Sequence, residues 1–395
     1  VIGLVLPDSP RRAPWELGVA PAWAEALYED AVPALADARE RKERRAASRI
    51  VLALAEPIPE LQAAWAKLIP LLDDPGFNRK AIVRRVRTIN DTARDARLPF
   101  YVDADVSLLG TGEGSRWNLN MSAYRIQESR SARMASLDLS TLWVESTDGR
   151  AAFKQGFSEP DSAYGVVILD QVRRNWDRQL APSLVGTDTS YYTSYGQYAK
   201  VLRDALEQVV IERAPRSWAG DASTAFDRYL VCLASVHTGI SSRLSERYCP
   251  SLVAEVEPLI IEALAQNVER HELQHMLDDQ NGGARIPEAV RSTLRGFGTA
   301  SLEHTAAELS AYLAEIADGP LPHLSLAHLV AVATSRPNSP EAAAGEVSRW
   351  LLSDDGTWDS PFSMSAPELR DRADYAFFQL FGRRVPAMKA GATKI

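Results

Sequence analysis

The spacing of hydrophobic residues changes twice along the chain. From Pro21 to Arg97, apolar residues recur at helical spacing in stretches rich in Ala, Leu, Glu and Arg, which favour helix. Between about residues 98 and 170 the period shortens to two, most clearly in Arg116–Ile126, where apolar and polar residues alternate. From about residue 187 onward helical spacing returns. This order predicts a predominantly helical α+β fold with a small antiparallel or mixed sheet.

Pro, Gly and Asp signals, which favour turns, separate the predicted elements. The predicted strands are Leu98–Val106, Arg116–Ile126, Leu137–Glu145 and Tyr164–Leu169. The predicted helices are Pro21–Arg49 (split or kinked at Pro33), Pro59–Leu72, Asn78–Arg97, Tyr191–Leu206, Ala222–Val236, Pro258–Leu277, Pro287–Arg295, Thr299–Ile316, Ser325–Thr334, Pro340–Leu352 and Ala366–Phe381. We therefore divide the chain into a helical N-terminal region (1–97), a small β-rich region (98–186), a second helical region (187–335) and a C-terminal helical region (336–395), which together could form one compact unit.

Composition and charge narrow the class of protein. The 395 residues are 46% hydrophobic and 24% charged, which is enough apolar chain for a large core and excludes intrinsic disorder. The net charge of −8 argues against a nucleic-acid partner. Two basic runs, Arg39–Arg49 and Arg79–Arg87, lie in predicted helices and are interpreted as solvated helix faces. No stretch reaches the roughly 18–20 apolar residues of a membrane helix, so we expect no membrane span.

Two features bear on the compartment, and the sequence leaves both open. The chain starts at Val1 without Met, which slightly favours an exported, periplasmic or secreted protein over a cytoplasmic one. Cys232 and Cys249 are 17 residues apart, a spacing that suits either one disulfide or two free thiols.

One segment carries a recognisable metal-binding pattern, His-Glu-Leu-Gln-His at residues 271–275. On a helix, His271 and His275 lie one turn apart on the same face, and two imidazoles at that spacing can bind one Zn²⁺ at about 2.0–2.1 Å each. Glu272 is rotated by about 100° from His271, so it can reach a water beside the metal without being a ligand. These three residue types in this pattern point to zinc-dependent hydrolysis with Glu272 as general base.

The surroundings of the motif agree with a buried site. An apolar stripe of Ile261, Leu264 and Val268 runs along the helix directly into the two histidines, so the histidines face the interior. Asp278 and Asp279 lie about one turn after His275. Either carboxylate could accept the outer N–H of a ligand histidine.

This segment resembles the zincin superfamily of zinc metallopeptidases, over about residues 259–316. The resemblance implies a bound zinc ion, a peptide or protein substrate, and Glu272 as general base. Asp278 and Asn281 stand where the metzincin pattern needs Gly and His, and Ser301 stands where the aspzincin pattern needs Asp. The resemblance is therefore to the gluzincins, which take a third ligand, Glu, from a second helix downstream.

The helix predicted at Thr299–Ile316 offers that third ligand. Glu308 ranks first because it borders the apolar stripe of the helix among small residues, where a buried charge needs a partner. Glu303 and His304 are the alternatives. Tyr312 and His304, one turn to either side of Glu308, are candidates to stabilise the oxyanion. The thermolysin-like pattern around the third ligand is absent.

The resemblance also implies a strand edge above the metal, for which Arg116–Ile126 is the candidate. Two other interpretations stay open: a catalytically inactive zincin that binds zinc or a partner, and a helical scaffold or binding protein in which the motif is accidental. The sequence does not specify the substrate, the choice between exo- and endo-cleavage, or the oligomeric state.

Overall fold

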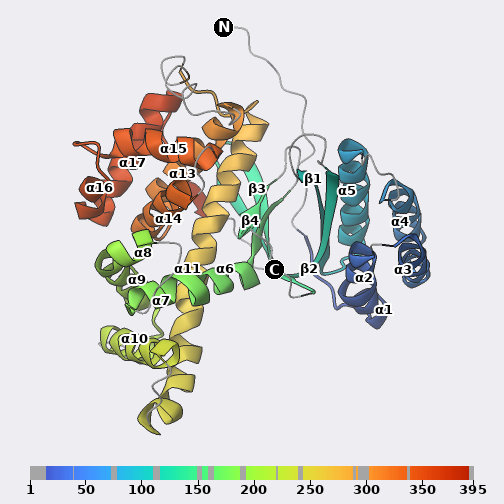
Figure 1. Cartoon of the computed structure of the whole chain (residues 1–395), viewed down its shortest axis with the longest axis horizontal. Coiled ribbons are helices and arrows are strands. Elements are labelled where there is room, and N and C mark those ends of the chain that lie inside the picture. Colours follow the sequence, from blue (N-terminus) through green and yellow to red (C-terminus); the bar gives the residue numbers. More distant parts are fainter. Residues whose placement is uncertain are drawn as a thin grey trace. The chain divides into compact units, whose positions relative to one another are not determined.

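The fold of the chain is predominantly helical α+β, as predicted, in a computed structural model (Figure 1). The structure describes residues 15–38, 40–72, 78–109, 116–148, 154–158, 164–186, 193–218, 221–238, 243–287, 291, 302–335 and 339–390. The helix predicted at residues 287–295 falls mostly outside these ranges. Among the described helices, none combines the length and apolar character that crossing a bilayer requires.

The chain forms two compact units. Unit 1 comprises residues 1–130, 142–152 and 392–395, and unit 2 comprises residues 131–141 and 153–391, so β2 and β3 have residues in both. The division of the sequence into four regions stays a prediction. The elements from α1 to β3 are α1 (Ala22–Glu25), η1 (Ala26–Ala31), α2 (Val32–Asp37), α3 (Arg41–Leu54), α4 (Pro59–Leu72), α5 (Arg79–Asp95), β1 (Phe100–Leu109), β2 (Arg116–Met134) and β3 (Leu137–Ser146).

In unit 1, α5 packs against β1, and α4 and α3 follow outward (Figure 1). The side chain of Asn90 on α5 joins helix and strand, because its amide donates to Val102 O at 2.8 Å and its carbonyl accepts from Val102 N at 2.9 Å. The buried residues of α5 recur at helical spacing and form the face toward the strand. The sequence pattern that predicted this helix is therefore also the pattern that positions it.

Unit 2 is mainly helical and contains the candidate site. Its elements are β4 (Gly156–Phe157), β5 (Gly165–Ile168), α6 (Leu169–Asn175), η3 (Trp176–Leu180), α7 (Ala181–Leu184), α8 (Thr193–Gln197), α9 (Ala199–Arg213), η4 (Arg216–Trp218), α10 (Ala222–Thr238), α11 (Arg243–Gln280), α13 (Leu302–Asp318), α14 (Pro322–Ser335), α15 (Pro340–Leu352), α16 (Asp359–Ser363), α17 (Ala366–Phe381) and β6 (Met388–Ala390). The central helix is α13, which packs against α11, α14, α15 and α17. Its position explains why ten of its residues are buried.

The described strands form one sheet in the order β1-β2-β3-β5-β4, and β6 pairs with the end of β2. The strand predicted at Arg116–Ile126 is the first part of β2, which lies between β1 and β3. Its residues pair with β1 along one side, and the expectation that this strand offers an edge to a substrate stays a prediction. The strand at one end of the order is β4, which pairs with β5.

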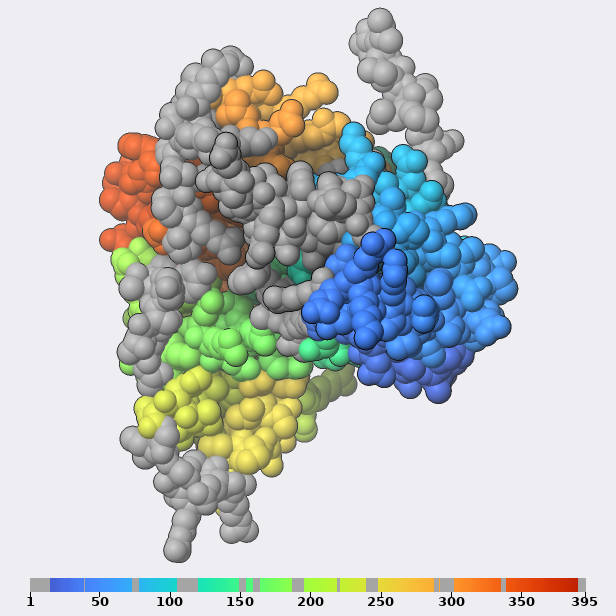
Figure 2. Space-filling view, turned by 45° about the vertical axis from the view of Figure 1, so that its right-hand side comes forward, coloured from blue at the N-terminus to red at the C-terminus, as the bar shows by residue number. Residues whose placement is uncertain are grey.

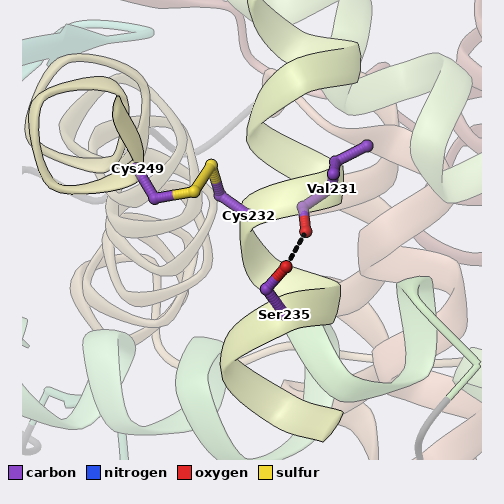
Figure 3. The surroundings of a disulfide bond; sticks show 4 residues. All are labelled: Val231, Cys232, Ser235 and Cys249. Atoms are coloured by element: carbon purple, nitrogen blue, oxygen red, sulfur yellow. Dashed lines mark hydrogen bonds between the residues drawn. A yellow bond between two sulfur atoms is a disulfide. The ribbon is translucent and has the colours of Figure 1, made fainter. Parts of the chain in front are cut away.

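The helix predicted at Pro258–Leu277 is longer than expected, because α11 begins at Arg243 and continues through Pro250 and Pro258. Proline removes a helical hydrogen bond and usually ends a helix, so tertiary contacts have to compensate. Here α10 packs along α11, and a disulfide joins Cys232 of α10 to Cys249 of α11 (Figure 3). Of the two alternatives for these cysteines, the structure shows the disulfide.

Candidate metal centre

Two imidazoles and one carboxylate converge between α11 and α13. His271 and His275 lie one turn apart on α11, with their Nε2 atoms 3.1 Å from each other. Glu308 of α13 places one carboxylate oxygen 3.6 Å from His271 Nε2 and the other 3.8 Å from His275 Nε2. Among the described residues, these three form the one group of His, Cys, Asp or Glu whose ligand atoms gather closely enough to hold a metal ion.

The spacing of these atoms suits one small divalent cation. Zinc bonds of about 2.0–2.1 Å at tetrahedral angles place neighbouring nitrogens about 3.3 Å apart. The two nitrogens are 3.1 Å apart, and the nitrogen–oxygen distances need to shorten by only a few tenths of an ångström. Two imidazoles and a carboxylate also match the donor chemistry of three-ligand zinc sites, which leave a fourth position open.

A second carboxylate holds the first histidine in place. Glu315, two turns beyond Glu308 on α13, lies with Oε2 3.1 Å from His271 Nδ1 and is 6% exposed. When Nδ1 donates its hydrogen to this carboxylate, Nε2 is directed toward the other two ligand atoms. From the sequence, Asp278 or Asp279 is expected in such a role. Asp278 instead accepts from Gln274 and Arg383, so the structure assigns Glu315 to His271.

The charges of the site indicate a place for a cation. Burial by itself lowers the pKa of His271, but the carboxylates of Glu308 and Glu315 outweigh it and raise that pKa well above its ordinary value. Burial, together with the charge of His271, lowers the pKa of His275 to about 4. Burial raises the pKa of Glu308, but the two histidines overcome it and bring that pKa down to about 2. The two carboxylates beside His271 therefore favour a positive charge at this position.

Glu272 lies on a different face of α11, toward the sheet. It is 6% exposed, and β4 and β5 pass so close that a Cβ built on Gly156 would lie 3.0 Å from Glu272 Cγ. A Cβ on Gly165 would lie 3.3 Å from Glu272 Cβ, so the two glycines let the strands approach the helix here. Burial raises the pKa of Glu272 to about 7, and the charges of His271 and Glu308 also act on it. This carboxylate thus belongs electrostatically to the same site.

The remaining predicted site residues differ in their placement. Tyr312 is 5% exposed, and its ring meets the ring of His271 edge to face at 4.7 Å between centroids. On its other side lies His328, with ring centroids 6.2 Å apart, and His328 Nδ1 is hydrogen-bonded to Tyr195 Oη at 3.0 Å. His304 is exposed, although its charge acts on His275 and Glu308. Glu303 is also exposed, and neither Glu303 nor His304 belongs to the ligand group.

A buried polar ladder on a third face of α11 holds the two site helices together. Arg270 is completely buried, donates from Nε to Asp318 of α13 at 3.0 Å, and donates from Nη2 to Pro386 O at 3.1 Å. Its guanidinium also contacts Gln274 Oε1, and Gln274 donates to Asp278 at 3.1 Å. The residues are spaced i, i+4 and i+8, a periodic signal in the sequence that could have predicted this ladder. The ladder was not predicted, because the faces of helices that pack in the core are usually recognised by the periodicity of apolar residues and not of polar ones.

Comparison of the chain with known protein families, with curated proteins and with solved structures finds no match. The function of the chain is therefore inferred from the residues of the site themselves.

Proposed function

We propose that the protein is a zinc-dependent hydrolase, and that it is a metallopeptidase. The observation that supports this most directly is the convergence of His271, His275 and Glu308 beside the buried carboxylate of Glu272. Three ligands with one open position are typical of catalytic zinc sites, whereas structural zinc sites are usually closed and rich in Cys. Both cysteines of this chain are in the disulfide, so they offer no thiolate.

The residues that would hold the metal are His271, His275 and Glu308, with Glu315 orienting His271. Bound zinc supplies Lewis acidity, which lowers the pKa of water in its coordination sphere and polarises a carbonyl oxygen. Glu272 accepts the proton of the attacking water as the new C–O bond forms. It then returns that proton to the leaving amine as the C–N bond breaks. Tyr312 packs against His271 and is the candidate to stabilise the oxyanion.

The strand beside Glu272 supports a peptide substrate. Gly156 and Phe157 form β4, which is the last strand in the sheet order and lies against α11 at Glu272. An extended peptide can add to such an edge through main-chain hydrogen bonds, which places a scissile amide next to the site without requiring a particular side chain. Ser158, directly after β4, is hydrogen-bonded to Glu272 and connects the edge strand with the general base.

Metal analysis tests the ligand assignment. We expect about one zinc per wild-type chain, and none in a His271→Ala, His275→Ala double variant, because one set of ligands with an open position binds one ion. Glu308→Ala should lose most of its zinc on dialysis. Elemental analysis of purified protein after incubation with zinc at neutral pH measures this. A wild-type chain without zinc, or a double variant that keeps it, would rule the site out.

Replacing Glu315 tests the orienting contact separately from the ligands. Glu315→Ala should weaken zinc affinity about 10- to 100-fold, because the ring of His271 loses the acceptor that fixes its Nδ1–H. Glu315→Gln keeps an acceptor and should recover part of that loss. Competition with a coloured chelator gives the affinities, and circular dichroism checks the fold. Equal affinity in all three proteins would remove Glu315 from this role.

A further inference from the structure

A concentration of positive charge lies outside the candidate site, on two helices of unit 1. Helices α3 and α5 together contain eleven Lys and Arg against three Asp and Glu, a net charge of +8, whereas the whole chain has −8. Both helices belong to unit 1, and His271, His275 and Glu308 belong to unit 2. The proposed hydrolase does not use these cations. They therefore call for a separate explanation.

Nine of these basic residues form no ion pair within the part of the chain that the structure describes. The nine, hereafter the basic surface, are Arg41, Lys42, Arg45, Arg49, Arg79, Lys80, Arg84, Arg85 and Arg87. Arg85 and Arg87 are half-buried and the other seven are exposed. None of the nine forms an ion pair with another described residue, in contrast to Arg94 of α5, which pairs with Asp91 and Asp95. The basic surface thus presents positive charge that no described acidic residue pairs with.

Helices α3 and α5 both pack against α4. Their basic N-terminal halves lie toward the same end of α4. The start of α3 is bound to the end of α4, because Arg44 Nη1 donates to Leu72 O at 2.7 Å. The end of α3 is bound to the start of α4, because Gln62 Nε2 donates to Leu52 O at 2.9 Å, so the two helices are antiparallel. A short connection leads from α4 to α5, which packs against α4 and is therefore antiparallel to it. The N-terminal halves of α3 and α5 consequently both lie toward the Leu72 end of α4.

The stability of the helices does not explain this placement. Arg79 and Lys80 occupy the first turn of α5, which has no acidic residue, although the positive end of the helix dipole disfavours cations there. On α3, Arg41, Arg45 and Arg49 follow one another at one-turn spacing and form a strip about 12 Å long. In the space-filling view, the blue segment that includes these helices forms part of the molecular surface (Figure 2). An anionic partner would relieve the unfavourable charge.

From these observations we propose that the basic surface binds the headgroups of an anionic phospholipid membrane. Seven of the nine residues are Arg, whose planar guanidinium binds phosphate oxygens in pairs. A cluster of this size on amphipathic helices suffices for attraction to an anionic bilayer surface. Ile50, 53% exposed on α3, offers an apolar contact beside the strip. The Cys232–Cys249 disulfide indicates an oxidising compartment, where membrane surfaces are accessible and nucleic acid is not the expected polyanion (Figure 3).

Vesicle binding by the full chain tests this proposal. Wild-type protein should sediment with vesicles of phosphatidylcholine and phosphatidylglycerol, but not with phosphatidylcholine alone, and high salt should release it. A variant with Arg45, Arg49, Arg84 and Arg87 replaced by Gln should bind on the order of 100-fold more weakly. The matched control replaces the exposed cations Arg178, Arg216, Arg228 and Lys389 of unit 2 by Gln. The control has the same net charge as the first variant and should bind the vesicles as tightly as wild type does.

Each outcome decides the question. Loss of binding in the first variant only, with unchanged circular dichroism, supports the basic surface. Two double variants keep the test valid if the fourfold variant does not fold. One carries Arg45→Gln with Arg49→Gln, the other carries Arg84→Gln with Arg87→Gln, and each should lose part of the vesicle binding. Equal loss in the matched control, no vesicle binding by wild type, or tight binding of duplex DNA with none to vesicles would overturn the proposal. Zinc content and hydrolysis are not involved, so failure of the proposed function would leave this result unaffected.

Discussion

Glu272→Gln is expected to reduce peptide hydrolysis by on the order of 1,000-fold or more while leaving zinc binding intact. Gln has nearly the size of Glu and still accepts a hydrogen bond from Ser158, but it cannot take a proton from water. His271, His275 and Glu308 are unchanged, so the metal remains. The measurement combines elemental analysis with mass spectrometry of a mixture of unstructured peptides, before and after incubation with each protein.

The control for this variant is Glu262→Gln, which makes the same chemical change earlier on α11, at a residue that pairs with Arg213. It should cleave at the wild-type rate. Full activity of Glu272→Gln would contradict the role of Glu272 as general base. A wild-type chain that binds one zinc but cleaves nothing in the mixture would instead favour an inactive zinc-binding protein. A chain with neither zinc nor cleavage would favour an accidental motif.

Arg270→Met is expected to lower the free energy of unfolding by about 2–3 kcal/mol, because it removes the completely buried partner of an ion pair whose other side chain, Asp318, is 28% exposed. The Met side chain fills a similar volume, so little of the loss comes from a cavity. Asp318 loses its charged partner, and Pro386 O and Gln274 Oε1 lose a donor in a buried environment. Chemical denaturation followed by circular dichroism measures the change.

The comparison for Arg270 is Arg133→Met, which breaks an ion pair with Asp138 between two exposed side chains. We expect no measurable change in the free energy of unfolding, since exposed ion pairs contribute little. If Arg270→Met were as stable as wild type, the ladder on α11 would be energetically neutral. In that case the hydrogen bonds of the ladder would only just compensate for removing the Arg270 guanidinium from water.

Zinc content of the Arg270 variant links stability to the site. The ladder connects α11 with α13, the two helices that bring Glu308 to the histidines. His271 directly follows Arg270 in the chain. A destabilised but folded variant should therefore show weaker zinc retention as well, through loss of helix pairing and not through loss of a ligand.

The sequence by itself determined the helices whose end signals are local. Pro59–Leu72, Pro340–Leu352 and Ala366–Phe381 were predicted with the bounds that the structure shows. For Ala366–Phe381 the reason is a capping box between Ser365 and Glu368 at the start and Gly382 with positive φ at the end. Such signals act within one turn of chain and need no partner. The placement of His271 and His275 on one face of a helix is likewise determined locally, because residues four apart in a helix lie on the same face.

Tertiary structure alone decided which groups meet that pair of histidines. Periodicity puts Glu303, His304 and Glu308 on one helix, but only the packing of α13 against α11 selects Glu308 and adds Glu315. The continuation of α11 through Pro258 is accompanied by packing against α10, the preceding helix, which the local pattern around Pro258 does not reveal. Strand order likewise decided that β4 lies at one end of the described sheet, and the close approach of Gly156 to α11 places it beside Glu272. A sequence pattern defines a face of an element, but which faces meet is set by packing across the whole chain.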